Sequence, residues 1–222
     1  MNKPIMLITG VSRGVGLACA EYFSDKYEIV GVSRTNGPYV TEIGSVTDLI
    51  FRKRLIFKYT PTVFINNAGV GGDTPYYRII QTNAEAAGDL MLGFADKMET
   101  GNIINISSWL ATISLNVYGS TGGYGELTYQ ATKKLLTSMS KELVTRRTGK
   151  VKITCIEPQA IDTDMTKEFL NDHLFIKPMS PTYIAETIDW IINQPPWVNV
   201  DSICLSNFKK IGAPEETRTP TH

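Results

Sequence analysis

Short apolar runs alternate along the chain with longer segments in which apolar residues recur every three or four positions. The runs have the length and composition of buried strands, and they are IMLI, EIVGVS, TVFI, NIINIS, VKITCIE and DSICLS. The periodic segments predict helices over GLACAEYF, 46–58, 77–98, 129–147 and 181–193. This alternation is typical of a parallel sheet covered by helices on both faces. We therefore predict an α/β fold, a single doubly wound Rossmann-like domain whose mostly parallel sheet has about seven strands.

One connection is too short for this pattern. Only RTNGP separates the strand that ends near Ser33 from the next extended segment, YVTEI. A parallel crossover that contains a helix needs about a dozen residues. We therefore predict a reduced or irregular strand at this edge, joined by a turn at Asn36, Gly37 and Pro38.

Length and charge narrow the possible functions. At 222 residues the chain has the size of one large domain, which we assign to residues 1–211. The tail over 212–222 is polar and contains proline, and we predict that it is disordered. Lys plus Arg equals Asp plus Glu at 22 each, so no global field favours nucleic acid or an anionic membrane. Few residues precede the first apolar run, which predicts neither a signal peptide nor a spanning helix and hence a cytoplasmic protein.

The few cysteines and histidines argue against several further kinds of protein and site. Cys19, Cys155 and Cys204 are widely spaced without a CxxC pair, which disfavours a disulfide framework or a closed zinc site. We interpret all three as buried packing residues. The two histidines are His173 and His222, the latter at the end of the polar tail. A Ser-His-Asp hydrolase or a multi-histidine metal site would rest on His173 alone, so we predict no metal.

The first strand leads into a glycine-rich turn, TGVSRGVG, which opens a helix. Glycines let the backbone turn sharply there and approach a pyrophosphate, whose charge is met by amide N–H groups and the positive end of the helix. Alone, such a turn favours nucleotide binding over plain turn geometry only weakly, and its position after the first strand strengthens that interpretation. The predicted cofactor-binding residues of the turn are Thr9, Gly10, Ser12, Arg13, Gly14, Val15 and Gly16.

A second motif, NNAG, follows the strand TVFI. An isolated NNAG is most simply a turn. Beside the glycine turn it predicts one wall of a cofactor cleft, because ligands of such sheets lie outside the carboxyl ends of the strands. Asn67, Ala68 and Gly69 are the residues expected to face the cofactor.

Tyr129 and Lys133 form the third motif, together with Ser107 and Ser108 at the end of NIINI. On a helix, a spacing of four places the phenol and the ammonium on one face. Acid/base work by a tyrosine at neutral pH needs nearby positive charge, because its free pKa is near 10. A serine can hold the substrate oxygen while a nicotinamide cofactor carries the hydride. A solvated Tyr-Lys pair is the alternative for a lone YxxxK, and the order of the three motifs favours carbonyl and alcohol redox chemistry.

The end of the second strand indicates which nicotinamide cofactor is used. NAD sites place a carboxylate there for the ribose 2′-OH, whereas NADP needs positive charge for its 2′-phosphate. This chain has Ser33, Arg34 and Thr35 without an acidic residue, and Arg13 lies in the glycine turn. Two guanidiniums on one phosphate would form charge-assisted hydrogen bonds. We therefore predict NADP(H), against the alternative of two exposed surface arginines.

Together these motifs resemble the classical short-chain dehydrogenase/reductase family over nearly the whole chain. The resemblance rests on TGVSRGVG, NNAG, QTNAEA, NISS, YQATK and EPQAIDT. It implies an NADP(H)-dependent oxidoreductase that reduces a carbonyl, or oxidises the corresponding alcohol, with Tyr129 as proton donor or acceptor. It also implies that Ser108 orients the carbonyl, that Lys133 binds the ribose and lowers the tyrosine pKa, and that Asn83 completes a proton relay.

Further positions follow from the same resemblance. In EPQAIDT, Pro158 and Thr163 match the family's proline and its carboxamide-binding threonine. Gln159 replaces a glycine of the family pattern, and Ile161 is expected to contribute backbone contacts.

The chain also departs from the family pattern. Ser108 precedes Tyr129 by 21 residues, an interval longer than is usual and similar to the short branch related to the C-factor signalling protein. Ser107 stays an alternative to Ser108. Ser45 and Val46 stand where the family commonly has an aspartate near the adenine, which leaves the adenine contact open.

Two functions from different classes follow. The first is the reductase or dehydrogenase, and the alternative is a cofactor-binding signalling or regulatory protein without relevant turnover. A complete Ser, Tyr and Lys set argues against the alternative, because a sensor has no need for a proton-transfer pair. Family analogy and the apolar helices 77–98 and 129–147 predict a homo-oligomer, a dimer or a tetramer. Several aromatic and apolar residues either form an apolar substrate mouth or only pack, namely Trp109, Tyr118, Tyr124, Phe169, Leu170 and Phe175.

Overall fold

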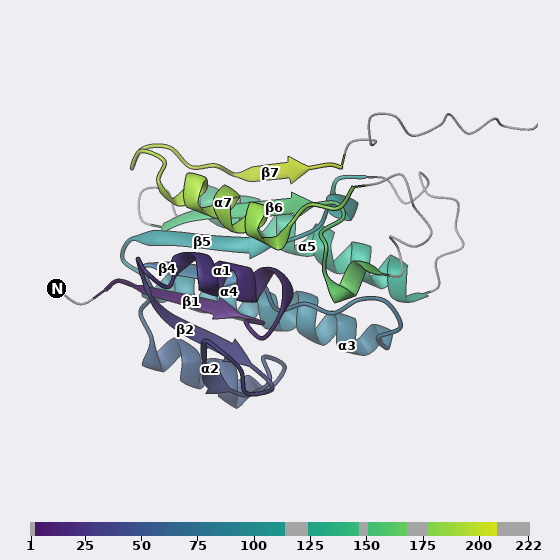
Figure 1. Ribbon diagram of the computed structural model, residues 1–222, viewed down its shortest axis with the longest axis horizontal. Coiled ribbons are helices and arrows are strands. Elements are labelled where there is room, and N and C mark those ends of the chain that lie inside the picture. Colours follow the sequence, from purple (N-terminus) through teal and green to yellow (C-terminus); the bar gives the residue numbers. More distant parts are fainter. Residues whose placement is uncertain (1–2, 114–123, 147–150, 168–176, 208–222) are drawn as a thin grey trace, which may run out of the picture.

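A single parallel sheet forms the centre of the computed structural model, which describes residues 3–113, 124–146, 151–167 and 177–207 (Figure 1). Its order is β3-β2-β1-β4-β5-β6-β7, and every strand pair is parallel. The strands are β1 (Ile5–Thr9), β2 (Glu28–Ser33), β3 (Val40–Ile43), β4 (Val63–Asn66), β5 (Gly101–Ile106), β6 (Val151–Pro158) and β7 (Ser202–Leu205). The predicted seven-stranded Rossmann-like fold is confirmed.

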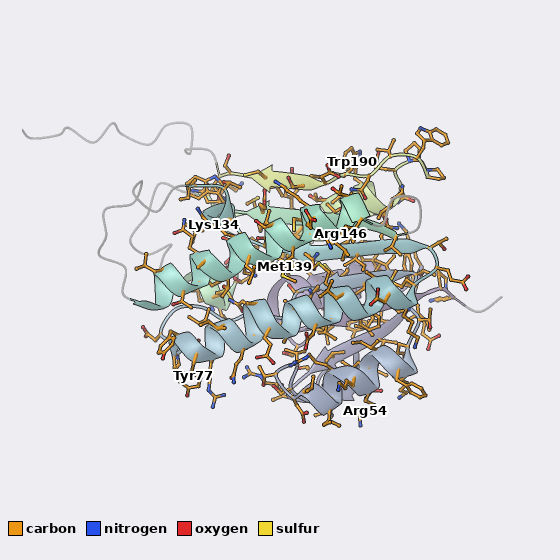
Figure 2. The ribbon with its side chains drawn as sticks, turned by 180° about the vertical axis from the view of Figure 1, so that it is seen from behind. Arg54, Tyr77, Lys134, Met139, Arg146 and Trp190 are labelled. Atoms are coloured by element: carbon orange, nitrogen blue, oxygen red, sulfur yellow. The ribbon has the colours of Figure 1, made fainter. Side chains whose placement is uncertain are left out.

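Helices cover both faces of the sheet. Those on one face are α1 (Gly14–Phe23) and α7 (Pro181–Ile192), and those on the other are α2 (Leu49–Lys58), α4 (Ala87–Lys97) and α5 (Tyr124–Arg146). Figure 1 shows the first pair in front of the sheet, and Figure 2 shows the second set from behind. Each face buries its own apolar cluster, because residues of the central strands alternate between them. None of the helices in the described ranges has the length and apolarity that crossing a membrane requires.

The edge strand β3 is reduced and irregular, as predicted. It pairs with β2 through a register shift between Gly31 and Val32, and no helix connects the two strands. A side chain at Gly31 would bring its Cβ to 2.0 Å from the carbonyl oxygen of Tyr39, which itself has a φ of 52°. A tight turn that packs onto Gly31 therefore replaces the usual crossover helix.

The helix predicted over 77–98 is divided. The structure has α3 (Tyr76–Ile80), a π-helical segment η1 (Gln81–Ala86) and then α4. Single-turn π segments inside helices occur often at functional sites, and this one carries Asn83. The helix predicted over 46–58 begins only at Leu49, because the carboxylate of Asp48 accepts hydrogen bonds from the N–H groups of its first turn.

The cysteine prediction is wrong in one case. Cys19 and Cys155 are buried, but Cys204 is exposed. Cys204 lies on β7, which ends the sheet and pairs only with β6 among the described strands. A side chain on such an edge strand need not be covered by a neighbouring element.

Candidate active site

A cleft of about 780 Å³ opens at the carboxyl ends of the central strands, where the chain reverses its winding between β1 and β4. Most of the residues predicted from sequence line it, namely Gly10, Ser12, Arg13, Gly14, Val15, Ser33, Arg34, Ser45, Val46, Asn67, Ala68, Gly69, Ser107, Ser108, Tyr129, Lys133, Pro158, Ile161 and Thr163. Four predicted residues lie outside this lining, namely Thr9, Gly16, Thr35 and Asn83. The three sequence motifs therefore meet around one cavity.

The glycine turn has the geometry of an anion site. Gly10 and Gly14 have φ values of 73° and 58°, in the left-handed region that favours glycine. A Cβ on Gly16 would lie 2.2 Å from the carbonyl oxygen of Gly10, so this glycine lets α1 approach the turn. Arg13 precedes the first turn of α1 and makes no side-chain cap there. The N–H groups of that turn and the helix dipole therefore suit a phosphate.

Thr9 and Asn67 support the cleft wall from behind. The fully buried hydroxyl of Thr9 accepts hydrogen bonds from the N–H groups of Asn67 and Ala68, both at 3.0 Å. The Asn67 amide donates to the carbonyl oxygens of Thr9, at 2.9 Å, and Gly10, at 3.2 Å. These bonds join the ends of β1 and β4, so Thr9 organises the glycine turn without lining the cleft.

Tyr129 and Lys133 lie on one face of α5, one turn apart. The Lys133 Nζ atom is 5.6 Å from the centroid of the Tyr129 ring and donates a 2.8 Å hydrogen bond to the carbonyl oxygen of Ile106. Burial lowers the pKa of Lys133 to about 8. Burial also raises the pKa of the Tyr129 phenol, while a hydrogen bond with the Ser108 side chain acts in the opposite direction. In the protein alone the tyrosine shift thus opposes the lowering that the family resemblance implies, because burial penalises the phenolate.

The two adjacent serines have different neighbours. Ser107 Oγ donates to the carbonyl oxygen of Lys133 at 3.1 Å and lies 2.9 Å from the Thr137 hydroxyl, so it helps to hold α5 against β5. Ser108 Oγ accepts a 3.2 Å hydrogen bond from the N–H of Leu110 and also bonds to Tyr129. Of the two hydroxyls, that of Ser108 is therefore the one beside the phenol.

Asn83 is buried in η1 and faces the loop that follows NNAG. Its Oδ1 accepts from the Val70 N–H at 2.9 Å, and its Nδ2 donates to the Val70 carbonyl oxygen at 2.8 Å. A Cβ built on Gly69 would lie 3.5 Å from Asn83 Oδ1 and 3.6 Å from Lys133 Nζ. Asn83 therefore shapes the wall beside Lys133, although its side chain does not line the cleft.

The two arginines reach the cleft from different sides. Arg34, at the end of β2, is exposed there. Arg13 Nη1 lies 3.8 Å from a carboxylate oxygen of Asp164, and both side chains are largely exposed. The Thr35 N–H donates to Ser33 Oγ at 3.3 Å, which closes the turn that presents Arg34.

The wall after β6 accommodates the glutamine that replaces the family glycine. Tyr39 is the only non-glycine residue with a positive φ among those that the structure describes, so Gln159 has ordinary backbone geometry. Its Oε1 accepts a 2.8 Å hydrogen bond from the N–H of Asn207. Thr163, further along, packs against the glycine turn, where a Cβ on Gly14 would meet its methyl group at 3.3 Å.

Sequence reasoning missed the part of the cleft that follows NNAG. The missed lining residues there include Val70, Gly71, Asp73, Thr74, Arg78, Gln81 and Thr82, and Met165 was missed after EPQAIDT. Gly71 packs close to the chemistry, since a Cβ there would lie 3.3 Å from the Tyr129 ring. The letters VGGDTP signal only a turn, so nothing local pointed to a binding surface. Of the predicted apolar mouth, Tyr118, Phe169, Leu170 and Phe175 lie outside the described residues.

Comparisons with known proteins identify the relatives of this chain. The short chain dehydrogenase family model matches residues 60–173. The chain is 30% identical to the 3-oxoacyl-(acyl-carrier-protein) reductase FabG of Haemophilus influenzae, over 78% of this chain and 79% of that protein. It is 26% identical to serine 3-dehydrogenase of Rhizobium radiobacter, over 90% of this chain and 92% of that protein.

Solved structures show the same fold. A closed serine dehydrogenase complexed with NADP+ has a TM-score of 0.78 at 20% identity and covers 90% of this chain and 94% of its own. The 3-alpha-hydroxysteroid dehydrogenase of a Pseudomonas species, complexed with NADH, has a TM-score of 0.77 at 16% identity and covers 91% and 94%. On the family match and the relative at 30% identity, the chain belongs to the short-chain dehydrogenase/reductase family.

Proposed function

We propose that this protein is an NADP(H)-dependent oxidoreductase that reduces a carbonyl compound, or oxidises the corresponding alcohol, with residues 1–211 acting as one dinucleotide-binding and catalytic domain. The observation that carries the proposal is that Tyr129, Ser108 and Lys133 line the same cleft as the glycine turn. The uncapped first turn of α1 offers N–H donors for the pyrophosphate, so the residues present fit a dinucleotide. A nicotinamide bound there would supply the hydride in reduction.

The chain's own residues handle the proton. Ser108 holds the carbonyl oxygen by a hydrogen bond, and Tyr129 delivers its proton to that oxygen as negative charge develops. Burial raises the pKa of Tyr129, which keeps the phenol protonated and able to donate at neutral pH. Lys133, whose pKa is about 8, is mainly protonated at pH 7, and its charge favours the phenolate left after transfer. In alcohol oxidation the proton moves in the opposite direction, from the substrate hydroxyl to the Tyr129 phenolate.

A substrate panel tests the proposed activity. Aldehydes, diketones, quinones and 3-oxoacyl thioesters, each assayed by the loss of NADPH absorbance, separate an enzyme from a sensor and one substrate class from another. Turnover of at least one class is expected. NADPH binding without turnover across the whole panel would favour the regulatory alternative.

Arg34 supports NADP(H) over NAD(H) and gives the first prediction. Wild-type protein is expected to bind NADPH more tightly than NADH, because an exposed guanidinium at the end of β2 can pair with the 2′-phosphate. Arg34→Ala should weaken NADPH by about tenfold, the equivalent of one charge-assisted hydrogen bond, and leave NADH nearly unchanged. Titration of both proteins with both cofactors measures this, and equal wild-type affinities would remove the assignment.

The second prediction concerns assembly. We propose a homodimer through α3, α4 and α5, which lie side by side on the face seen in Figure 2. Tyr77, Ile80, Leu92 and Leu135 are exposed by 41 to 49% on these helices. Apolar side chains gathered on neighbouring helices are typical of an isologous interface. Light scattering at micromolar concentration should give a dimer or tetramer mass, and Leu135→Glu should reduce it. A monomeric wild type would contradict the proposal.

A further inference from the structure

Helix α2 carries a guanidinium that the proposed chemistry does not use. Arg52 is only 1% exposed, the largest side chain among those that are fully buried. Its Nη1 donates to the carbonyl oxygen of Val46 at 2.8 Å, and its Nη2 contacts Glu85 at 3.0 Å and Asp89 at 2.7 Å. Its Nε is buried without a hydrogen-bond partner among the described residues. Burying a cation in this way is unfavourable unless its contacts compensate, so what the contacts hold is informative.

One end of this network is a wall of the cleft. Val46 belongs to the loop 44–47, all four residues of which line the cleft. The loop lies beside the end of β2, since the Gly44 N–H donates to the Ser33 carbonyl oxygen at 2.8 Å. The cofactor-selective Arg34 follows directly. The loop therefore faces the half of the cleft in which the 2′-phosphate and adenine of the proposed cofactor would lie.

The other end is the helix that carries Asn83. Glu85 lies in η1, and Asp89 lies in the first turn of α4. Arg52 thus connects loop 44–47 to η1 and α4. The two carboxylates keep 54% and 45% of their side-chain surface exposed, so solvent can satisfy them without Arg52. The hydrogen bond to the Val46 carbonyl oxygen is buried instead, so losing Arg52 would leave that oxygen without its partner.

The loop's own side chains do not replace this anchor. Ser45 Oγ lies 2.8 Å from the Thr47 hydroxyl and accepts from the Thr47 N–H at 3.3 Å, so its hydrogen bonds stay within the loop. Asp48 is engaged in capping α2. A planar guanidinium, fixed by two carboxylates and bonded to one carbonyl oxygen, defines the orientation of the Val46 peptide unit.

We propose that Arg52 is a positioning residue for the adenine half of the cofactor, acting through the Val46 peptide and loop 44–47. This inference rests on the proposed dinucleotide function of the cleft. It requires that loss of Arg52 impair recognition of the adenine half while the nicotinamide half, bounded by Tyr129 and Lys133, keeps its affinity. A purely structural role would weaken both halves or neither.

The test compares three probes by calorimetric titration: NADPH, adenosine 2′,5′-bisphosphate for the adenine half, and reduced nicotinamide mononucleotide for the other half. Arg52→Met is expected to weaken the first two by about tenfold and to change the third by less than about twofold. Lys53→Met is the matched control, because it removes one positive charge from an exposed neighbour on the same helix and should change none of the three.

Equal weakening of all three probes, or unchanged NADPH affinity in a folded Arg52→Met, would overturn the inference. If Arg52→Met does not fold, Arg52→Lys is measured instead, since it keeps the charge and loses the planar guanidinium. It too should weaken NADPH and adenosine 2′,5′-bisphosphate more than reduced nicotinamide mononucleotide. Wild-type protein that binds none of the probes would contradict the proposed function and this inference with it. Wild-type binding followed by an unselective loss contradicts the role of Arg52 alone.

Discussion

Tyr129→Phe is expected to lower turnover of the carbonyl substrate by about 10²-fold or more while the cofactor still binds. The substitution keeps the ring and its packing beside Gly71, where a Cβ would lie 3.3 Å from the ring. It removes only the hydroxyl that we propose as the proton donor. Because the chemistry and not the shape of the cleft changes, the effect should fall on kcat at unchanged cofactor affinity.

The measurement combines NADPH titration with steady-state kinetics on the best substrate of the panel. Tyr183→Phe is the matched control, because Tyr183 is 47% exposed on α7 and does not line the cleft. It should behave as wild type. A Tyr129→Phe enzyme that reduces its substrate at the wild-type rate would show that the proton comes from another group.

The sequence predicts most of the architecture because its signals are local. Strand and helix periods differ, and the shortness of RTNGP alone excludes a helix before β3. The π segment η1 could not be predicted in this way. A π turn inside a helix adds one residue without removing the apolar pattern, so the segment around Asn83 has an ordinary helical sequence.

Part of the candidate site could likewise be predicted from local sequence, and part could not. The spacing of Tyr129 and Lys133 fixes their common face once α5 is a helix. Adjacent serines on an extended chain point in opposite directions, so the choice between Ser107 and Ser108 depends on which side α5 covers. From the sequence, Ser108 could be preferred only through the family resemblance. Contacts between distant parts of the chain, such as Arg13 with Asp164, leave no local sequence signal. These required the structure.

Lys133 gives the second large effect, on stability as well as activity. Burial lowers its pKa from the ordinary 10.5 to about 8, a difference that corresponds to about 3 kcal/mol against the folded state. Below pH 8 the amine is protonated in both states, so the folded protein bears the whole penalty. Between pH 8 and 10.5 the unfolded chain binds more protons than the folded one, and the free energy of unfolding therefore rises with pH.

Lys133→Met should consequently be more stable than wild type at pH 7 and far less active. The lost hydrogen bond to the Ile106 carbonyl offsets roughly 1 kcal/mol, which leaves a net gain of about 2 kcal/mol in the free energy of unfolding. Turnover should fall because the charge that favours the phenolate is gone, a trade of function for stability. Urea unfolding at pH 7 and pH 10 measures the gain in stability and its dependence on pH, and the NADPH absorbance assay measures the loss of turnover. Lys134→Met is the neighbouring control, which should keep the rise of stability with pH. A Lys133→Met protein that is less stable than wild type at pH 7, or whose free energy of unfolding rises with pH as much as that of wild type, would show that burial of the Lys133 cation does not destabilise the folded state.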